Sequence, residues 1–345
     1  GKGADMSQVT LGMTGITVNK NGFGALPVQR VSMEEAGKLL RKAFENGITF
    51  FDTARAYTDS EAKIGYALSD VRDQIYIATK TAAETADDFW RDLETSLSVL
   101  KTEYIDIYQF HNPSFCPKPG DGTGLYEAML EAKSQGKIRH IGITNHRLSV
   151  AQEAIDSGLY EILQFPFCYL ASEKDLAIVE ACKEKQIGFI AMKALSGGMI
   201  TDSAAAYAYL DQFDHVLPIW GVQREKELDE FIGYVKNPPV MTKEIEALIA
   251  HDRKELAGNF CRGCGYCMPG PVGIEINNCA RMSLMIRRSP SEAQLTQEVQ
   301  EKMKQIENCL HCGRCSSKCP YNLDTPKLLE ENYKDYMEIL AGKPL

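Results

Sequence analysis

Short apolar runs alternate with amphipathic segments along residues 21 to 236. Apolar runs bounded by turn residues predict buried strands, whereas apolar positions that recur every three or four residues predict helices. The expected strands are Gly22–Leu26, Ile48–Asp52, Ile75–Thr79, Tyr104–Gln109, Ile138–Ile143, Glu161–Phe165, Gly188–Met192 and Val216–Trp220. The expected helices are Met33–Asn46, Glu61–Asp70, Asp87–Leu100, Leu125–Gln135, Leu148–Ser157, Glu173–Lys185 and Glu225–Lys236.

Strands that alternate with helices predict an α/β fold built on a parallel sheet. Eight strands, each followed by a helix or a loop, in about 215 residues predict a closed (β/α)8 barrel of the TIM type. The alternative is a doubly wound open sheet. Its dinucleotide fingerprint is incomplete, because Gly22-Phe23-Gly24 is followed by Pro27 where the third glycine should stand. Four glycines follow expected helices and predict C-terminal caps: Gly47, Gly136, Gly158 and Gly188.

The alternating pattern ends at Pro238-Pro239, which breaks the last of these helices. A polar helix, Thr242–Leu256, leads from there into a cysteine-rich region. In that region apolar residues recur at steps of four, four and three, which predicts a helical face that packs in a core. These residues are Leu295, Val299, Met303 and Ile306. We therefore expect a barrel over residues 1–237, a linker helix over 238–257 and a small, mostly helical domain over 258–345.

The chain has 345 residues and a net charge of −9, nearly all of it in the barrel region. An acidic chain without a basic stripe is a poor partner for nucleic acid. The sequence has neither a run of about 18 apolar residues nor a charged-then-apolar signal pattern. We therefore expect no membrane span and a cytoplasmic location. Met6 is the expected natural start, with Gly1 to Asp5 as an added leader.

Eight of the eleven cysteines lie between residues 261 and 319. Clustered cysteines in a chain without an export signal predict metal ligation rather than disulfides. The second group, Cys309-x2-Cys312-x2-Cys315-x3-Cys319-Pro320, has the spacing of bacterial ferredoxins with iron–sulfur clusters. The first group, Cys261-x2-Cys264-x2-Cys267, lacks the fourth cysteine that should stand just before a proline, since Gly270 precedes Pro271. Cys279 could supply the missing thiolate.

In a two-cluster ferredoxin, the fourth cysteine of each run ligates the other cluster. One [4Fe-4S] cluster is therefore expected on Cys261, Cys264, Cys267 and Cys319, and the other on Cys309, Cys312, Cys315 and Cys279. Two alternatives stay open. One is tetrahedral zinc, which cysteine triplets fit poorly, and the other is a single cluster. The other cysteines are expected to be ordinary buried or loop thiols: Cys116, Cys168 and Cys182.

Four polar residues fall at or just after the ends of expected strands, where active sites of such barrels form. They are Asp52, Tyr57, Lys80 and His111. A lysine ammonium beside a tyrosine lowers the pKa of the phenol, and an aspartate beside the lysine keeps the lysine charged. Together the four residues could supply a proton to a carbonyl oxygen as its carbon accepts hydride. Each residue alone could equally be a helix cap, a rim charge or a packed ring.

At these residues the sequence resembles the aldo/keto reductase family. The resemblance rests on three segments that carry the family's Asp, Tyr, Lys and His: Phe51-Asp52-Thr53-Ala54-Arg55-Ala56-Tyr57, Ala78-Thr79-Lys80-Thr81 and Tyr108-Gln109-Phe110-His111-Asn112. It covers residues 6 to about 236, and the cysteine-rich tail resembles the iron–sulfur branch of the same family. The resemblance implies NADP(H) or NAD(H) as the cofactor of the barrel, beside two [4Fe-4S] clusters in the tail.

The resemblance also implies where the nicotinamide cofactor binds. The expected residues are Thr144, Asn145 and Gln164 for the carboxamide, Met192 beside the nicotinamide ring, Gly197 and Gly221 for the pyrophosphate, and Gln223 and Arg224 for the adenosine end. Two positions depart from the family. Met192 stands where the family usually stacks an aromatic ring, and a Lys/Arg-Ser pair for the 2′-phosphate of NADPH is missing after the eighth strand. The resemblance favours NADP, and the choice between NADP and NAD stays open.

The expected activity is NAD(P)H-dependent reduction of an aldehyde or ketone, with Tyr57 as general acid and His111 orienting the oxygen. Leu26, Pro27, Phe115 and Trp220 are expected to line the pocket of this small carbonyl substrate. A second class of function is electron transfer between a ferredoxin-type partner and a cofactor in the barrel. A third is a nucleotide-binding sensor in which the clusters are structural. A reductase that carries such clusters is typical of an anaerobe.

Overall fold

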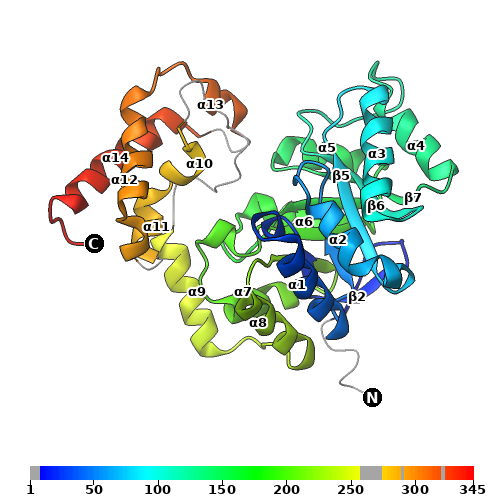
Figure 1. Cartoon of the computed structure of the whole chain (residues 1–345), viewed down its shortest axis with the longest axis horizontal. Helices are drawn as coiled ribbons and strands as arrows, with labels where there is room; N and C mark the ends of the chain where they lie inside the picture. The colour runs from blue at the N-terminus through cyan, green and yellow to red at the C-terminus, as the bar shows by residue number, and fades with distance from the viewer. Residues whose placement is uncertain (1–7, 257–273, 289–290, 320–322) are drawn as a thin grey trace. The chain divides into compact units, whose positions relative to one another are not determined.

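The computed structural model describes residues 8–256, 274–288, 291–319 and 323–345. The chain divides into two compact units. The first contains the residues up to Ala194 together with Ala204–Lys243. The second contains Leu195–Ser203 and the described residues from Glu244 to Leu345. Figure 1 shows the elements of both units in sequence colours.

The first unit is a closed barrel of eight parallel strands in the order β10-β3-β4-β5-β6-β7-β8-β9. Its strands are β3 (Gly22–Gly24), β4 (Phe50–Asp52), β5 (Tyr76–Thr81), β6 (Ile105–His111), β7 (Ile138–Thr144), β8 (Ile162–Pro166), β9 (Gly188–Met192) and β10 (Val216–Gly221). Each lies where a strand was expected, which confirms the (β/α)8 barrel. Closure between β10 and β3 excludes the doubly wound open sheet.

Eight helices follow the barrel strands along the chain (Figure 1). They are α1 (Met33–Glu45), α2 (Ser60–Leu68), α3 (Ala86–Leu100), α4 (Leu125–Ser134), α5 (Leu148–Ser157), α6 (Glu173–Glu184), α7 (Ser203–Asp211) and α8 (Glu225–Lys236). Hydroxyl caps start several of them, since Ser32, Thr85 and Ser172 each accept a hydrogen bond from the first turn of a helix. Helix α7 was not expected. Its residues Ala205–Leu210 are all buried, so its sequence has no polar face to reveal a helical period.

Three of the four expected glycine caps are confirmed by left-handed backbone angles. The φ angles of Gly47, Gly136 and Gly158 are 93°, 75° and 69°. The expectation for Gly188 is wrong, because this residue begins β9. A Cβ atom there would lie 2.5 Å from Ile162 Cδ1 and 3.0 Å from Leu11 Cβ, so a larger residue would require the packing around the start of β9 to shift.

A hairpin of β1 (Gln8–Thr10) and β2 (Thr17–Asn19) precedes the barrel and was not expected. Its buried residues Val9, Leu11, Ile16 and Val18 form one hydrophobic cluster with Phe50, Ala78, Ile107, Ile162, Ile190, Leu217 and Ile219 of the barrel. Phe50 and Ala78 each lie two positions before a polar residue, Asp52 and Lys80. Because alternate residues of a strand share a face, those two polar residues lie one layer nearer the carboxyl ends of the strands. The hairpin thus covers the opposite end of the barrel.

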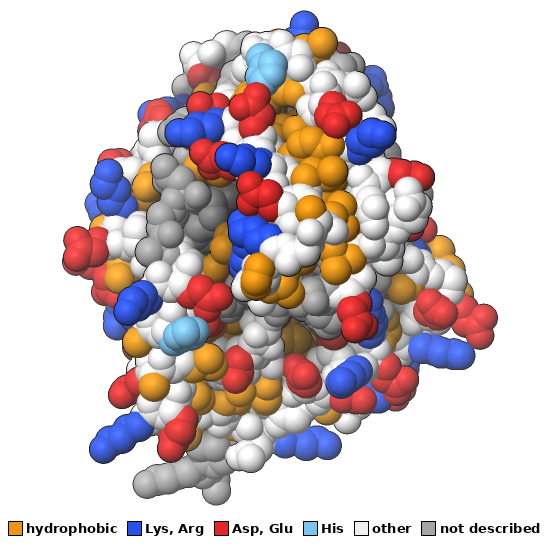
Figure 2. Space-filling model, turned by 90° about the vertical axis from the view of Figure 1, so that its left-hand side faces the viewer, with side chains coloured by type: hydrophobic (Ala, Val, Ile, Leu, Met, Phe, Trp, Pro, Cys, Tyr) orange, Lys and Arg blue, Asp and Glu red, His pale blue; other side chains and the backbone are white. Residues whose placement is uncertain are grey.

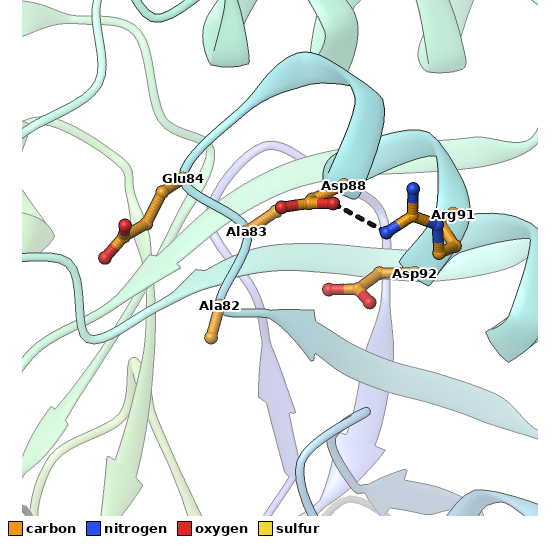
Figure 3. A pocket seen from close by; sticks show the side chains of 6 residues that line it. All are labelled: Ala82, Ala83, Glu84, Asp88, Arg91 and Asp92. Atoms are coloured by element: carbon orange, nitrogen blue, oxygen red, sulfur yellow. Dashed lines mark hydrogen bonds and ion pairs between the residues drawn. The ribbon is translucent and has the colours of Figure 1, made fainter.

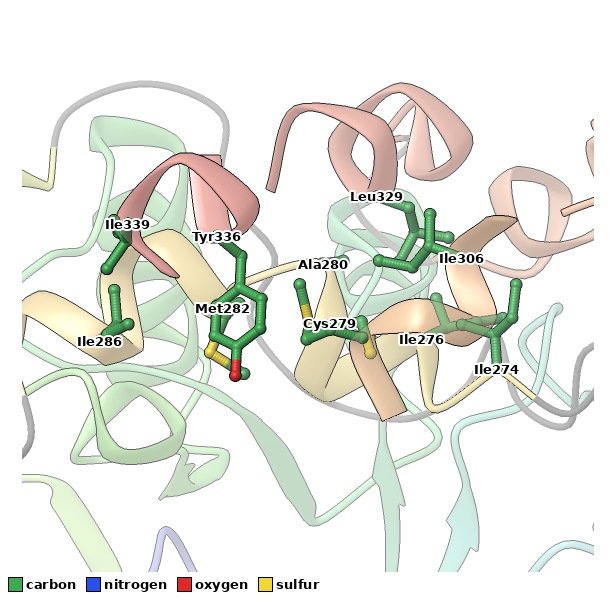
Figure 4. Packing of buried hydrophobic residues seen from close by; sticks show 11 residues of the cluster. Ile274, Ile276, Cys279, Ala280, Met282, Ile286, Ile306, Leu329, Tyr336 and Ile339 are labelled. Carbon is green, nitrogen blue, oxygen red and sulfur yellow. The ribbon is translucent and has the colours of Figure 1, made fainter. Parts of the chain in front are cut away.

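The second unit is mostly helical, as expected. Its elements are α9 (Lys243–Glu255), α10 (Ile276–Cys279), α11 (Met282–Arg288), η4 (Ser291–Gln294), α12 (Gln297–Lys304), η5 (Gln305–Asn308), α13 (Arg314–Lys318) and α14 (Thr325–Leu340). Figure 4 shows its core, in which Tyr336 of α14 lies beside Met282 of α11. Met303 and Ile306 are buried there, with Leu295 and Val299 packed against the cluster. This confirms that the apolar face predicted from the sequence packs in a core.

The surface and the helix lengths bear on possible partners. No helix in the described ranges is long and apolar enough to cross a membrane. Figure 2 shows acidic and basic side chains interspersed over one face, without a large area of a single charge.

Candidate active site

The four predicted catalytic residues lie at neighbouring strand ends of the barrel. Asp52 ends β4, Lys80 is next to last in β5 and His111 ends β6. Tyr57 follows in the loop between β4 and α2. The structure therefore brings side chains from three consecutive parallel strands and one loop to the carboxyl end of the barrel, where such folds place their chemistry.

Lys80 and Asp52 form a buried ion pair. The Lys80 Nζ donates to Asp52 Oδ2 at 2.8 Å and to the Thr53 carbonyl oxygen at 2.6 Å. The two side chains are only 1% and 2% exposed, so neither charge could remain here without the other. Burial raises the pKa of Asp52, and the nearby Lys80 and Gln164 side chains partly oppose this rise.

Tyr57 lies between the ion pair and His111. The Lys80 Nζ is 5.0 Å from the centre of the Tyr57 ring. The rings of Tyr57 and His111 meet edge to face, with centroids 5.9 Å apart. All four side chains thus share one small site.

The pKa values in this site differ from the sequence-based expectation. Burial raises the pKa of Tyr57 well above 10, and the Asp52 carboxylate raises it further. The Lys80 ammonium was expected to lower the tyrosine pKa, but the paired carboxylate offsets its charge and desolvation dominates. Burial also lowers the pKa of His111 to about 3, and Lys80 adds to this effect. At neutral pH the tyrosine is therefore a protonated phenol and the histidine a neutral imidazole.

Gln109 is a site residue that the sequence reasoning did not single out. It is 0% exposed, and its Nε2 donates to Gln164 Oε1 at 3.1 Å. Gln164 in turn lowers the pKa of Asp52. Strand alternation could have revealed this residue, because Gln109 lies two positions before His111 and therefore on the same face of β6.

Two of the predicted cofactor residues hold the loop that follows His111. The Asn145 Nδ2 donates to the Pro113 carbonyl oxygen at 2.7 Å, and its Oδ1 accepts from the Arg147 amide at 2.9 Å. The Thr144 hydroxyl accepts from the Asn112 amide at 3.1 Å. These buried contacts fix the backbone beside His111, whatever else the two side chains bind.

The other predicted cofactor residues lie at or after the ends of β9 and β10. Met192 ends β9, is partly buried and packs against the interior cluster. Gly197, in the short helix Ser196–Gly198, has φ 65°, and its carbonyl oxygen accepts from Arg281 of the same unit at 2.6 Å. Gly221 ends β10 and is exposed, and a Cβ atom there would lie 3.2 Å from Pro27. The Gln223 Oε1 accepts from Arg30 at 3.3 Å, and Arg224 is exposed at the start of α8.

The expectation that Trp220 lines the substrate pocket is wrong. Its side chain is 1% exposed and stacks on Phe231 of α8, with ring centroids 4.9 Å apart. Its indole nitrogen donates to the Lys20 carbonyl oxygen at 3.0 Å. Because side chains alternate along a strand, Trp220 faces the helices while its neighbour Ile219 belongs to the interior cluster.

An open hollow of about 450 Å³ lies beside the start of α3 (Figure 3). Its lining residues are Ala82, Ala83, Glu84, Asp88, Arg91 and Asp92. Arg91 donates to Asp88, three residues earlier in the same helix, at 2.8 Å. None of the four predicted catalytic residues lines this hollow, so it is distinct from the site described above.

The predicted iron ligands fall in two groups. Cys261, Cys264 and Cys267 lie outside the described residues. Cys279 ends α10, is 2% exposed and belongs to the core of the second unit, with its Sγ 3.7 Å from the Lys302 carbonyl oxygen (Figure 4).

The cysteines of the second motif lie around α13. Cys309 and Cys315 are partly buried and pack against the core that contains Cys279. Cys312 is exposed, and Cys319 follows the end of α13. Within the described part of the chain, no three Cys, His, Asp or Glu side chains are gathered closely enough to hold a metal ion.

Comparison with known proteins agrees with this geometry. Residues 16–216 match the family model described as the aldo/keto reductase family. The chain belongs to the aldo/keto reductase family. Residues 260–324 match the model of a 4Fe-4S dicluster domain, which agrees with the cysteine spacing of the tail.

Similar proteins are known from several organisms. The chain is 28% identical to aldo-keto reductase YhdN of Bacillus subtilis, over 57% of this chain and 64% of that protein. It is 29% identical to L-galactose dehydrogenase of Arabidopsis thaliana, over 56% of this chain and 66% of that protein. The matched region thus spans slightly less than two-thirds of each relative.

Solved structures share the fold of the barrel. The holo form of aldo-keto reductase AKR11C1 from Bacillus halodurans has a TM-score of 0.62 at 20% identity, over 72% of this chain and 96% of that one. An aldo-keto reductase from Klebsiella pneumoniae in complex with NADPH has a TM-score of 0.61 at 21% identity, over 71% of this chain and 94% of that one. At these identities the likeness concerns the fold alone.

Proposed function

We propose that this aldo/keto reductase uses NAD(P)H to reduce the carbonyl group of a small aldehyde or ketone. The observation that carries the proposal is the buried Lys80–Asp52 pair beside the Tyr57 phenol, with His111 facing the same ring. Protonated tyrosine and neutral histidine suit a reaction in which a carbonyl oxygen must receive a proton.

Each of the four residues has a separate role in the proposed carbonyl reduction. A bound nicotinamide would supply hydride from its C4 atom to the carbonyl carbon. The Tyr57 phenol donates its proton to the carbonyl oxygen, so the product is an alcohol. His111, as a neutral imidazole, orients that oxygen by a hydrogen bond. Lys80, held by Asp52 and Thr53, stabilises the negative charge that develops on the tyrosine oxygen.

The residues available for the cofactor fit an extended nucleotide. Those of the barrel unit lie at or just after the ends of β7 to β10: Thr144, Asn145, Gln164, Met192, Gly221, Gln223 and Arg224. Gly197 belongs to the second unit. Gly221 is exposed, so the backbone there can approach a pyrophosphate. Asn145 and Gln164 already bond protein groups, so each has only part of its amide to offer a carboxamide.

Anaerobic steady-state kinetics test the proposal. Purified protein is mixed with NADH or NADPH and a panel of aliphatic and aromatic aldehydes and ketones. We expect loss of nicotinamide absorbance that depends on the carbonyl compound and matches the alcohol formed one to one. If no carbonyl compound accelerates nicotinamide oxidation while both nucleotides bind, the proposal is overturned.

We predict that the reaction rate shows no dependence on the ionisation of His111 near neutral pH. Its pKa is lowered to about 3 by burial and by Lys80, so the ring stays neutral at every pH well above that value. The profile of kcat/KM between about pH 5 and pH 8 should therefore show no ionisation near the ordinary histidine value of about 6.5. An ionisation in this range that is present in the native protein and disappears in His111→Gln would contradict the prediction.

We further propose two [4Fe-4S] clusters in the second unit, with Cys279 as the eighth ligand. Eight cysteines lie in the tail, and eight thiolates are what two such clusters need. Cys279 lies in the core against which Cys309 and Cys315 pack, so three thiols of the proposed second set border the same core. These side chains must draw closer together than they lie in the structure to hold a cluster. Cys319 would join Cys261, Cys264 and Cys267 on the first cluster.

Replacing Cys279 by serine tests this ligand. We expect about eight iron atoms per native chain and about four in Cys279→Ser, since a cubane that lacks one thiolate is readily lost. Cys182→Ser is the matched control, because Cys182 is an equally buried thiol in α6 of the barrel. Iron and sulfide are assayed after anaerobic purification. Full iron content in Cys279→Ser would remove Cys279 from the ligand set.

Electron transfer with a ferredoxin-type partner is a second candidate function. It is supported by the match to a dicluster domain and by Cys312, a proposed cluster ligand on the surface. Clusters move single electrons and nicotinamide moves two, so this function requires a further carrier such as a flavin. Visible spectra of the anaerobic protein before and after addition of NADH, and separately of NADPH, decide the point. Bleaching of the cluster bands would support the candidate, and unchanged spectra would leave the clusters a structural role.

A further inference from the structure

The carboxylate of Glu227, at the start of α8, contacts the loop after β10, and this contact bears on the choice between NADH and NADPH. Glu227 lies in the first turn of α8 and accepts two backbone hydrogen bonds with its Oε1. One comes from the Gln223 amide at 3.1 Å and the other from the Arg224 amide at 2.9 Å. Gln223 and Arg224 are the residues that the family resemblance implies for the adenosine end of the cofactor.

Barrels of this class bind phosphate groups at the loops after their seventh and eighth strands, where backbone amides point at the anion. Here the amides of Gln223 and Arg224 already point at the Glu227 carboxylate. A phosphate bound to these amides would have to displace the carboxylate or lie in contact with it. Two anions at contact distance repel each other, so Glu227 weighs against a phosphorylated ribose.

The same carboxylate suits an unphosphorylated ribose. A ribose hydroxyl is a hydrogen-bond donor, and a carboxylate is a strong acceptor. Both backbone bonds go to Oε1, so Oε2 is the oxygen that would accept from the sugar. Because the backbone amides hold the carboxylate in place, binding would cost little additional ordering.

Other charged side chains near this turn do not cancel the repulsion between Glu227 and a ribose phosphate. Glu225 and Asp229 each pair with Lys42 at 2.7 Å, so that lysine is engaged with carboxylates. Arg30 donates to the Gln223 side chain at 3.3 Å. Arg224 and Lys226 are the exposed cations of this turn that could favour a phosphate, and the Arg224 amide is one of the two held by Glu227.

We propose that Glu227 is a specificity-determining residue that makes this chain prefer NADH, with its free ribose 2′-hydroxyl, over NADPH. The inference rests on the proposed use of a nicotinamide cofactor and narrows it. This expected preference for NADH differs from the preference for NADP that the family resemblance favours. The charge of Glu227, and not that of Arg224, then determines which cofactor binds more tightly.

Equilibrium binding tests the inference without relying on turnover. The full-length protein, purified anaerobically, is titrated with NADH and separately with NADPH, and the fluorescence of the bound nicotinamide gives each dissociation constant. Native protein should bind NADH more tightly. Glu227→Gln keeps the shape and an acceptor oxygen but removes the charge, and should shift the ratio of the two affinities toward NADPH by about tenfold. Glu225→Gln is the matched control, because it removes a charge from the same turn that pairs with Lys42 instead of the loop amides.

The possible results distinguish the proposed role of Glu227 from the proposed reductase activity. Tighter binding of NADPH by the native protein, or an unchanged ratio in Glu227→Gln, overturns the role of Glu227 and leaves the reductase proposal standing. An equal shift in Glu225→Gln also overturns it, since the effect would then be general charge near the loop. If neither NADH nor NADPH binds, the reductase proposal is overturned together with this inference.

Discussion

Replacing Tyr57 by phenylalanine is expected to lower kcat for carbonyl reduction by about 10²–10⁴-fold, the usual contribution of a general acid. The change removes one oxygen atom and the proton that it donates. It leaves the ring in contact with His111 and Lys80, so the site keeps its shape. Nucleotide affinity should not change, because the phenol acts on the carbonyl oxygen and not on the nucleotide. Stopped-flow absorbance under argon measures the rate, and fluorescence titration measures the affinity.

Tyr66→Phe is the matched control for this experiment. Tyr66 lies in the neighbouring helix α2, but its side chain is 56% exposed and outside the site. The control should retain native turnover. Full turnover in Tyr57→Phe would show that the proton comes from another group, and the assignment of the acid would be wrong.

Replacing Lys80 by methionine is expected to have the largest effect on stability. Methionine has a similar length but no charge, so Asp52 would be left as a buried carboxylate without its partner. Removing one member of a buried ion pair typically lowers the free energy of unfolding by about 3–5 kcal/mol. The intrinsic fluorescence of Trp90 and Trp220 is a suitable probe, because these are the two tryptophans of the chain and both lie in the barrel unit.

A double variant separates stability from catalysis. Asp52→Asn combined with Lys80→Met removes both charges, so the cost of an unpaired buried carboxylate disappears. We expect the double variant to recover most of the lost stability while its reductase rate stays low, because the tyrosine oxygen still lacks a neighbouring cation. A double variant as unstable as Lys80→Met alone would show that the pair is not the source of the stability loss.

The barrel was predictable because its signal repeats. Each strand is a short apolar run between turn residues, and eight of them in sequence leave few folds to choose from. The β1–β2 hairpin was missed because its two strands are only three residues long each and belong to no repeat. Helix α7 was missed for the opposite reason, since a helix buried on all sides has no polar stripe.

The candidate site was predictable in its residues and not in its electrostatics. Strand ends in a parallel barrel meet at one rim, so Asp52, Lys80 and His111 could be placed together from their positions alone. The direction of the Tyr57 pKa depends on how much water the folded site excludes and on how closely Asp52 offsets Lys80. Neither quantity can be read from spacing. The role of Glu227 depends in the same way on which amides its carboxylate meets after folding.

The cysteine motifs show a similar division. Their spacing predicted an iron–sulfur tail, and the match to a 4Fe-4S dicluster domain confirms that class. Spacing alone does not establish which cysteine replaces the one that the first motif lacks, because Cys279 lies outside both motifs. Its burial against the same core as Cys309 and Cys315 is information that only the folded chain provides.

The most direct test of direct hydride transfer traces the hydrogen from C4 of the nicotinamide to the carbonyl carbon of the substrate. The protein is mixed under argon with a carbonyl substrate and reduced nicotinamide cofactor that carries deuterium at both C4 positions, and the alcohol product is examined by mass spectrometry and NMR. Direct hydride transfer in the site of Tyr57 and His111 predicts one deuterium on the carbinol carbon and none on the oxygen after exchange with water. Reduction of the carbonyl without deuterium in the product would contradict the account, because the electrons would then have reached the substrate by another route.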